Sequence, residues 1–214
     1  MTLHRDQLLA RLHQIIHPTV YLETGVQLGG SLSLAGGAHL AIGVDPNPLI
    51  QESGNQVIYA QDSDSYFAAH PRQNHQIIDF GYVDGDHTFE QAMRDFLNIQ
   101  ARGSYKTIVA FDDVLPYNQT VGSREPVPGD WAGDVWRVYD ALKLNQPELI
   151  LVLVDVVPTG VLLVWNLDPF AGPKASVFDA VHPFSGPVPD DVINRTYAVD
   201  ANEALDLVQQ KVGH

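Results

Sequence analysis

Acidic and imidazole side chains gather where an apolar segment gives way to a helical pattern. Asp84, Asp86 and His87 directly follow the apolar run 77–83. In an open parallel α/β sheet, ligands bind at the end of a strand that leads into a helix. A histidine there can transfer protons near neutral pH, because its ordinary pKa lies close to that range. We therefore expect a functional role for this cluster.

Turn formation and helix capping are the simpler interpretation of the same stretch. Gly85 suits a bend, and Thr88 suits the N-cap of the helix that follows. Those two roles leave the two carboxylates and the imidazole without an explanation.

Apolar segments predict the sheet that positions these residues. Five of them end in an acidic or polar residue before a loop or helix, which is typical of parallel strands joined by crossover helices. The turn residues at 158–160 separate two further segments and force them to pair as an antiparallel hairpin. The sequence thus predicts an α/β fold with a seven-stranded, mostly parallel sheet, helices on both faces and a C-terminal antiparallel hairpin. The predicted strands are 20–22, 40–44, 57–60, 77–83, 107–111, 149–154 and 161–165.

One domain accounts for the whole chain. We expect a core over about 19–166, an N-terminal helix over 3–17 and a tail over 167–214, of which only a helix at 201–211 can be assigned. The segment 114–134 interrupts the alternation with prolines and glycines, and a loop of that length is typically a functional lid or disordered. Three of its side chains, those of Tyr117, Arg124 and Trp131, are candidates to line a substrate site.

Composition restricts the class of partner. The 214 residues carry a net charge of -14, so nucleic acid and anionic membranes are not expected to bind. The chain has no cysteine, which excludes disulfides and thiolate chemistry. The sequence contains no signal-peptide pattern and no membrane-spanning apolar run, so we expect a cytoplasmic protein.

A glycine-bearing turn follows the first predicted strand. It reads Glu23-x-Gly25-x-x-x-Gly29-Gly30, and this spacing does not match the dinucleotide fingerprint G-x-G-x-x-G. A nicotinamide oxidoreductase is therefore a poor match.

An acid two residues before the first glycine resembles the first motif of class I S-adenosylmethionine-dependent methyltransferases. The chain departs from the commoner E-x-G-x-G form at Gln27. Members of that family share the Rossmann-like seven-stranded plan, and the resemblance covers residues 19–166. It implies that Asp45 binds the ribose hydroxyls and that Asp62 and Ser63 contact the adenine of S-adenosylmethionine. The full implied cofactor set is Glu23, Gly25, Gly29, Ser31, Asp45, Asp62 and Ser63.

The second half of the sequence resembles the metal-dependent macrocin and catechol O-methyltransferase branch. Two sequence motifs, V-D-G-D-H-T-F and later F-D-D-V, are the basis of this resemblance. It implies that Asp84, Asp112 and Asp113 bind a divalent cation such as Mg²⁺. Three oxygen ligands on adjacent strand ends suit a hard cation, whereas three clustered carboxylates without one would repel each other. Capping by Asp112 and Asp113 is the alternative.

The resemblance implies transfer of a methyl group to a hydroxyl of a small molecule. His87 is the leading candidate for the base that removes the hydroxyl proton, with Asp84 and Asp86 as alternatives. Two other functions stay open, namely a metal-independent methyltransferase and a methyltransferase-like binding module without turnover. Relatives of the cephalosporin-hydroxylase type carry similar D-G-D-H motifs. The acceptor and the oligomeric state, including a homo-oligomer, are left open.

Overall fold

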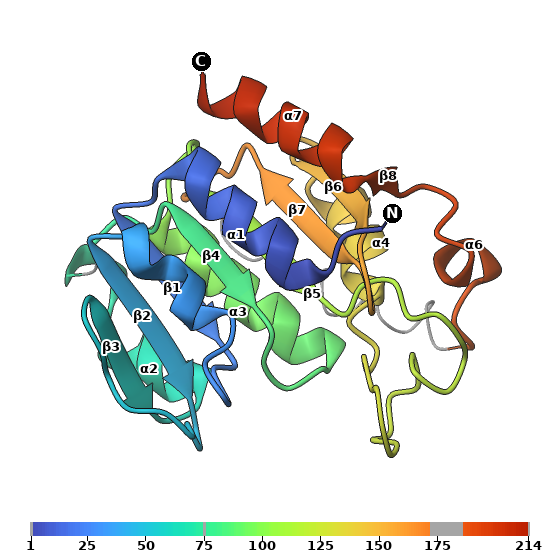
Figure 1. The fold of residues 1–214 in the computed structure, drawn as a ribbon, viewed down its shortest axis with the longest axis horizontal. Coiled ribbons are helices and arrows are strands. Elements are labelled where there is room, and N and C mark those ends of the chain that lie inside the picture. The colour runs from blue at the N-terminus through green and yellow to red at the C-terminus, as the bar shows by residue number, and fades with distance from the viewer. Residues whose placement is uncertain (1, 75, 172–185, 214) are drawn as a thin grey trace.

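The protein is described by a computed structural model that covers residues 2–74, 76–171 and 186–213 (Figure 1). A single mixed sheet runs through it in the order β3-β2-β1-β4-β5-β7-β6-β8. The first five strands are parallel, β7 is antiparallel to both β5 and β6, and β8 is parallel to β6. The strands are β1 (Val20–Thr24), β2 (Leu40–Asp45), β3 (Gln56–Ala60), β4 (Phe80–Val83), β5 (Ile108–Asp112), β6 (Ile150–Asp155), β7 (Val161–Trp165) and β8 (Val199–Asp200).

The predicted sheet is confirmed, with two differences. Ile77 is exposed and precedes the fourth strand, which begins at Phe80. The two residues of β8 extend the edge of the sheet beside β6, and such a short strand has too few residues to show an alternating pattern.

Helices cover both faces of the sheet. The cluster of buried side chains on one face is contributed by α1 (Arg5–Ile16), the 3₁₀ helix η1 (Leu32–Gly37) and α7 (Ala201–Val212). The other face is covered by α2 (Ser63–Ala69), α3 (Phe89–Arg102) and α4 (Arg137–Asn145). Two short helices, η2 (Arg72–Asn74) and α6 (Asp190–Ile193), complete the described elements. Within the described ranges, no helix has the length and apolar character needed to cross a membrane.

The N-terminal helix α1 packs beside α7 on the same face of the sheet (Figure 1). It starts two residues later than predicted because His4 acts as its N-cap. The His4 imidazole accepts a hydrogen bond from the backbone N–H of Asp6, and the Gln7 side chain accepts one from the backbone N–H of His4. This capping fixes the position of Arg5 as the first helical residue.

The register of the parallel strands brings their carboxyl ends to one edge. Thr24 of β1 lies beside Val44 of β2 on one side and Val83 of β4 on the other, and Val83 lies beside Phe111 of β5. The residues that follow these strands therefore converge on the same edge.

Candidate active site

Two carboxylates and one imidazole converge after β4 and β5. The Nε2 of His87 lies 3.7 Å from Asp84 Oδ1, and its Nδ1 lies 3.1 Å from Asp113 Oδ2. Each of the three residues offers one ligand atom, and these atoms all lie within 4.8 Å of one another. Nitrogen and oxygen donors at this spacing suit a divalent cation.

Hydrogen bonding fixes the tautomer of His87. Its Nδ1 lies 2.7 Å from the carbonyl oxygen of Trp131, and a carbonyl can only accept. The proton of the neutral imidazole is thus on Nδ1, which leaves the Nε2 lone pair facing Asp84. His87 and Asp113 both have positive φ, at 52° and 64°, a conformation that costs energy and is common at functional sites.

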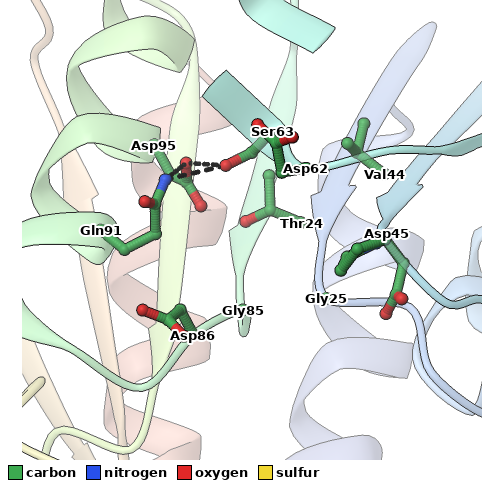
Figure 2. A pocket seen from close by; sticks show the side chains of 11 residues that line it. Thr24, Gly25, Val44, Asp45, Asp62, Ser63, Gly85, Asp86, Gln91 and Asp95 are labelled. Atoms are coloured by element: carbon green, nitrogen blue, oxygen red, sulfur yellow. Dashed lines mark hydrogen bonds between the residues drawn. The ribbon is translucent and has the colours of Figure 1, made fainter. Parts of the chain in front are cut away.

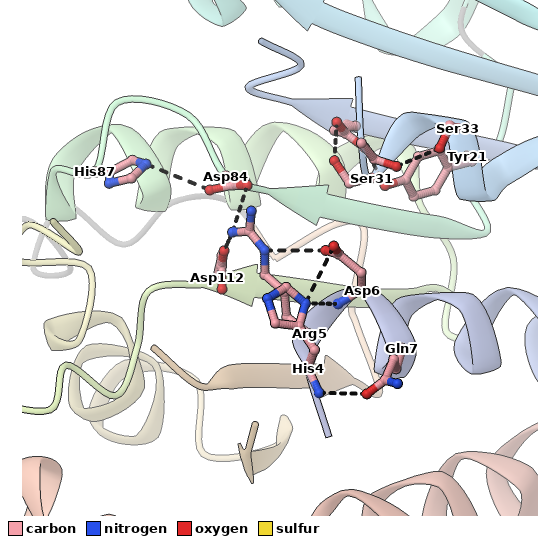
Figure 3. A network of polar contacts seen from close by, with 12 residues as sticks. His4, Arg5, Asp6, Gln7, Tyr21, Ser31, Ser33, Asp84, His87 and Asp112 are labelled. Carbon is pink, nitrogen blue, oxygen red and sulfur yellow. Dashed lines mark hydrogen bonds and ion pairs between the residues drawn. The ribbon is translucent and has the colours of Figure 1, made fainter. Parts of the chain in front are cut away.

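Arg5 of α1 enters the acidic cluster from the opposite side (Figure 3). Its Nη1 lies 3.3 Å from Asp84 Oδ2 and forms an ion pair with Asp112, whose side chain is 1% exposed. Asp112 therefore faces the guanidinium and Asp113 faces His87, whereas Asp84 turns one oxygen to each of them. The structure places the three predicted metal ligands close together but groups only two of them with His87.

Burial controls the protonation of these acids. It raises the pKa of Asp84 to about 7, with a further increase from the charge of Asp113, while Arg5 and His87 oppose the shift. Burial likewise raises the pKa of Asp113 above its ordinary value, and His87 opposes it. A cation placed between the two carboxylates would favour their ionised forms.

The glycine turn lies directly against this cluster. Gly25 has φ of 89°, and a Cβ built there would lie 1.7 Å from the carbonyl oxygen of Asp84, so only glycine fits. Gln27, which replaces the family's second glycine, adopts the left-handed region at φ 43° and donates its backbone N–H to Asp45 at 2.8 Å. Gln27 therefore adopts a backbone conformation that glycine favours.

Two cavities follow the carboxyl ends of the strands. The first cavity has a volume of about 310 Å³ (Figure 2), and the second has a volume of about 650 Å³. Gly25, Asp45 and Gly85 line both cavities, which are thus neighbours. The first is lined by Thr24, Gly25, Val44, Asp45, Pro46, Asp62, Ser63, Gly85, Asp86, Gln91 and Asp95. Arg5, Ser31, Asp84 and His87 are among the residues that line the second.

A third cavity lies on the far side of His87. It has a volume of about 200 Å³ and is lined by His4, Arg5, His87, Asp113, Asp130, Trp131, Pro158 and Thr159. Arg5 and His87 line both the second and the third cavity. These two residues therefore lie where a molecule in one cavity would meet a molecule in the other.

The predicted cofactor residues fall into two groups. Gly25, Ser31, Asp45, Asp62 and Ser63 line the first or the second cavity.

Glu23 and Gly29 are not among the lining residues. Glu23 is fully buried behind the turn, where its carboxylate accepts hydrogen bonds from Tyr21 and Ser31, each at 2.7 Å. Burial raises its pKa to about 8.

The segment 114–134 contributes one of its three candidate residues to the third cavity. The Trp131 ring stacks on His87 with centroids 5.1 Å apart. Tyr117 is instead a donor to Asp130 at 3.0 Å, and Arg124 pairs with Glu90 of α3 and with Asp134. These contacts hold the segment against α3 and His87.

Asp134 also changes the expected capping of α3. Thr88 occupies the N-cap, but its hydroxyl donates to Asp86 at 3.0 Å. The backbone N–H of Phe89 donates to Asp134 at 2.8 Å. The segment after β5 therefore caps the helix that follows β4.

Three functional candidates were missed by the sequence reasoning: Arg5, Gln91 and Asp95. Arg5 reaches the site from α1, and no local pattern relates it to Asp84 and Asp112, which follow β4 and β5 much later in the chain. Gln91 and Asp95 lie four residues apart on α3, a spacing that places side chains on one helix face. That spacing was the available signal for these two.

Comparison with known proteins agrees with this architecture. Residues 22–114 match the family model of a methyltransferase domain. A search of the curated proteins gives no match.

Solved structures with a similar fold include three bacterial proteins. An O-methyltransferase from Bacillus cereus in complex with SAH has a TM-score of 0.58 at 14% identity, covering 75% of this chain and 80% of that one. The O-methyltransferase TomG from Streptomyces achromogenes, involved in tomaymycin synthesis and in complex with SAM, has a TM-score of 0.59 at 14% identity, covering 77% and 80%. A methyltransferase from Geobacter sulfurreducens has a TM-score of 0.54 at 14% identity, covering 78% and 81%. At these identities the likeness establishes a shared fold.

Proposed function

We propose, from the premise that residues 22–114 of this chain are a methyltransferase domain, that the protein methylates a hydroxyl of a small molecule with S-adenosylmethionine. In this reaction the bond between the sulfonium sulfur and the methyl carbon breaks, and a bond from that carbon to the acceptor oxygen forms. The hydroxyl proton passes to a base, and S-adenosylhomocysteine and a methyl ether leave.

The arrangement of the cavities around Arg5 and His87 is the observation that carries this proposal. The first two cavities share Gly25 and Asp45, so a long ligand can cross the ends of β1 to β3. The third cavity meets the second at Arg5 and His87. A methyl donor in the first two cavities and an acceptor in the third would thus present their reacting atoms at one place.

The cofactor roles follow from this placement. Asp45 lines both of the first two cavities and suits a central ribose, because a carboxylate oxygen can accept more than one hydrogen bond. Ser63 in the first cavity suits the base, and Ser31 in the second suits the methionine end. Gly25 lines both cavities, and its lack of a side chain lets the backbone of the turn approach the ligand closely. Glu23 would act indirectly, by holding the Ser31 hydroxyl.

His87 is the residue best placed to accept the hydroxyl proton. Its Nε2 lone pair is unprotonated in the tautomer that Trp131 imposes, and its side chain lines the third cavity. Asp84 lies 3.7 Å from that nitrogen and would stabilise the imidazolium that forms. Asp86 lines the first cavity and not the third, which makes it a weaker candidate.

The donor set at Asp84, His87 and Asp113 fits a divalent cation; its two carboxylates suit Mg²⁺, whereas its imidazole suits a transition metal such as Zn²⁺ or Fe²⁺. When bound, such a cation would lower the pKa of an acceptor hydroxyl and hold its oxygen. His87 would then be a ligand, and proton removal would pass to another group. Asp112 would join the set only if Arg5 moved away from it.

Arg5 favours a second candidate, methyl transfer without metal. Its guanidinium already supplies one positive charge to Asp84 and Asp112, and it lines the acceptor side of the cluster. In this version His87 is the base. The acceptor class, a cytoplasmic location and any homo-oligomer also stay proposals.

Calorimetric titration with S-adenosylhomocysteine, with and without Mg²⁺, tests the proposal. We expect saturable binding to the wild-type protein. An increase in affinity with Mg²⁺ that Asp113→Asn abolishes would support the cation site. Equal binding under both conditions would favour the metal-free version. Folded protein that binds no S-adenosylhomocysteine would contradict methyl transfer and support a binding module.

A further inference from the structure

Asp95 is a buried carboxylate that the proposed reaction does not use. It lies on α3, is 1% exposed and forms part of the wall of the first cavity (Figure 2). Its Oδ1 accepts a hydrogen bond from the Ser63 hydroxyl at 2.6 Å and another from the Gln91 amide at 2.9 Å. A buried carboxylate costs free energy unless it accepts hydrogen bonds, and here two side chains of the cavity wall donate to its Oδ1.

Asp95 takes up the hydrogens that the cavity's polar side chains could otherwise offer to a ligand. A serine hydroxyl has one hydrogen, and that of Ser63 is donated to Asp95. The amide nitrogen of Gln91 donates to Asp95 and, at 2.9 Å, to Ser63 Oγ. The Thr24 hydroxyl is buried and forms no hydrogen bond, by distance and angle, with any described residue, although it lies close enough to Asp95 to lower the pKa of that carboxyl against the effect of burial.

Acceptors remain on the ligand side of the wall. Ser63 Oγ has two lone pairs, and one accepts from Gln91, so the second is available to a ligand. Three other lining side chains, Asp45, Asp62 and Asp86, are carboxylates that only accept when ionised. The polar side chains of the described cavity wall therefore match a ligand that carries hydrogen-bond donors.

We infer that Asp95 determines base specificity, because it holds Ser63 as an acceptor that selects the 6-amino group of adenine and rejects a 6-oxo group. This inference rests on the proposed function, which places the base beside Ser63. A site built around one hydrogen-bond polarity discriminates strongly against an analogue of the opposite polarity, since buried groups are then left unpaired. Burial raises the pKa of Asp95 to about 6, so the carboxylate is ionised and accepting at pH 7.5.

The test compares S-adenosylhomocysteine with S-inosylhomocysteine, which has an oxo group in place of the amino group. Calorimetry at pH 7.5 measures both affinities for each variant. We expect the wild-type protein to prefer the adenine compound by roughly tenfold or more, the range expected for one mismatched buried hydrogen bond. Asp95→Ala frees the Ser63 hydroxyl to donate or accept. The ratio of the affinity for S-adenosylhomocysteine to the affinity for S-inosylhomocysteine should therefore fall towards one. Asp95→Asn should keep most of it, because its amide oxygen can still accept from Ser63 and Gln91.

Two further variants separate specificity from stability. Ser63→Ala removes the acceptor and should also bring the ratio towards one, so it carries the test if Asp95→Ala fails to fold. Asp79→Ala is the matched control. Asp79 accepts from the backbone of Thr19 and Val20 at 2.8 and 3.0 Å, away from the cavity, so its loss should lower stability and leave the ratio unchanged.

Each outcome has one meaning. If the folded wild-type protein does not bind S-adenosylhomocysteine, the proposed function fails. If it binds both compounds equally well, methyl transfer stands and the role of Asp95 is overturned. Retention of the full ratio in Ser63→Ala, or in a folded Asp95→Ala, overturns it as well.

Discussion

Single carboxylates in this site divide their oxygens between different partners. Asp84 faces Arg5 with one oxygen and His87 with the other, and Asp45 accepts backbone N–H groups from Gln27 and Asn47 on separate oxygens. A carboxylate shared in this way is held in one orientation, because both neighbours constrain it. The site is therefore preorganised by its own side chains.

Glu23 gives a prediction for the dependence of stability on pH. Burial raises its folded pKa to about 8, above the ordinary 4.5, so the native state binds a proton that the unfolded chain releases. Its contribution to stability is therefore present below about pH 4.5 and is lost as the pH rises to 8. Within that window the slope approaches about 1.4 kcal/mol per pH unit for one proton. Glu23→Gln should flatten this slope in urea unfolding measured at pH 5, 6.5 and 8.

The exposed Glu125 offers a matched control for that measurement. Glu125→Gln removes the same charge from the surface and should leave the slope of the wild-type protein unchanged. Parallel slopes for Glu23→Gln and the wild-type protein would mean that Glu23 is ionised in the fold.

The elements that build the site extend beyond the matched methyltransferase segment. Helix α1 precedes residue 22 and supplies Arg5, while the segment after β5 supplies Trp131 and the N-terminal hydrogen bond of α3. The cluster after β4 and β5 is thus enclosed by α1, which lies far from it in sequence, and by the segment that follows β5. Its geometry depends on how α1 packs on the sheet.

Arg5→Met should destabilise the protein by about 1–3 kcal/mol at pH 8. Removing one partner of a buried ion pair typically costs about 3–5 kcal/mol, and the cost is smaller here because the Arg5 side chain is 31% exposed. The loss should shrink at pH 5.5, because Asp84 then carries a proton and needs no counter-charge. Urea unfolding at both pH values measures the difference.

Arg11→Met is the control for the role of α1. Arg11 lies on the same helix, and its guanidinium contacts Asn202 of α7 at 3.3 Å on the surface. Its replacement should change stability little and equally at both pH values. If Arg5→Met lowers the free energy of unfolding equally at both pH values, Arg5 stabilises the protein by packing instead of by its charge.

The whole molecule carries a net charge of -14, and acids line its first two cavities. S-adenosylmethionine has a net positive charge, whereas S-adenosylhomocysteine is neutral overall. The field of the protein should therefore favour the methyl donor over the product. Raising the ionic strength from about 0.01 M to about 0.15 M shortens the Debye length from roughly 30 Å to roughly 8 Å. We expect S-adenosylmethionine to lose affinity severalfold over this range.

S-adenosylhomocysteine provides the internal reference for that prediction. It differs from the donor by one methyl group and one charge, so its affinity should depend much less on salt. Calorimetry of both compounds at several salt concentrations gives the comparison. Equal salt dependence would mean that local contacts outweigh the field of the molecule.

The sequence alone determined the sheet and a resemblance to methyltransferases, with which the match of residues 22–114 to a methyltransferase domain model agrees. The parallel strands, the antiparallel hairpin and the placement of acids and His87 directly after strand ends could be read locally, because strand ends and turn residues follow one another along the chain. Parallel pairing then places consecutive strand ends at one edge without further information.

Only the tertiary structure decided which groups share these carboxylates. Asp112 looked equivalent to Asp113, yet successive residues at a strand end point in different directions, so one meets Arg5 and the other His87. Arg5 and Trp131 reach the cluster through the packing of α1 and of the segment after β5, which no local periodicity encodes. The direction of each hydrogen bond at Asp95 likewise depends on α2 and α3 meeting at one buried carboxylate.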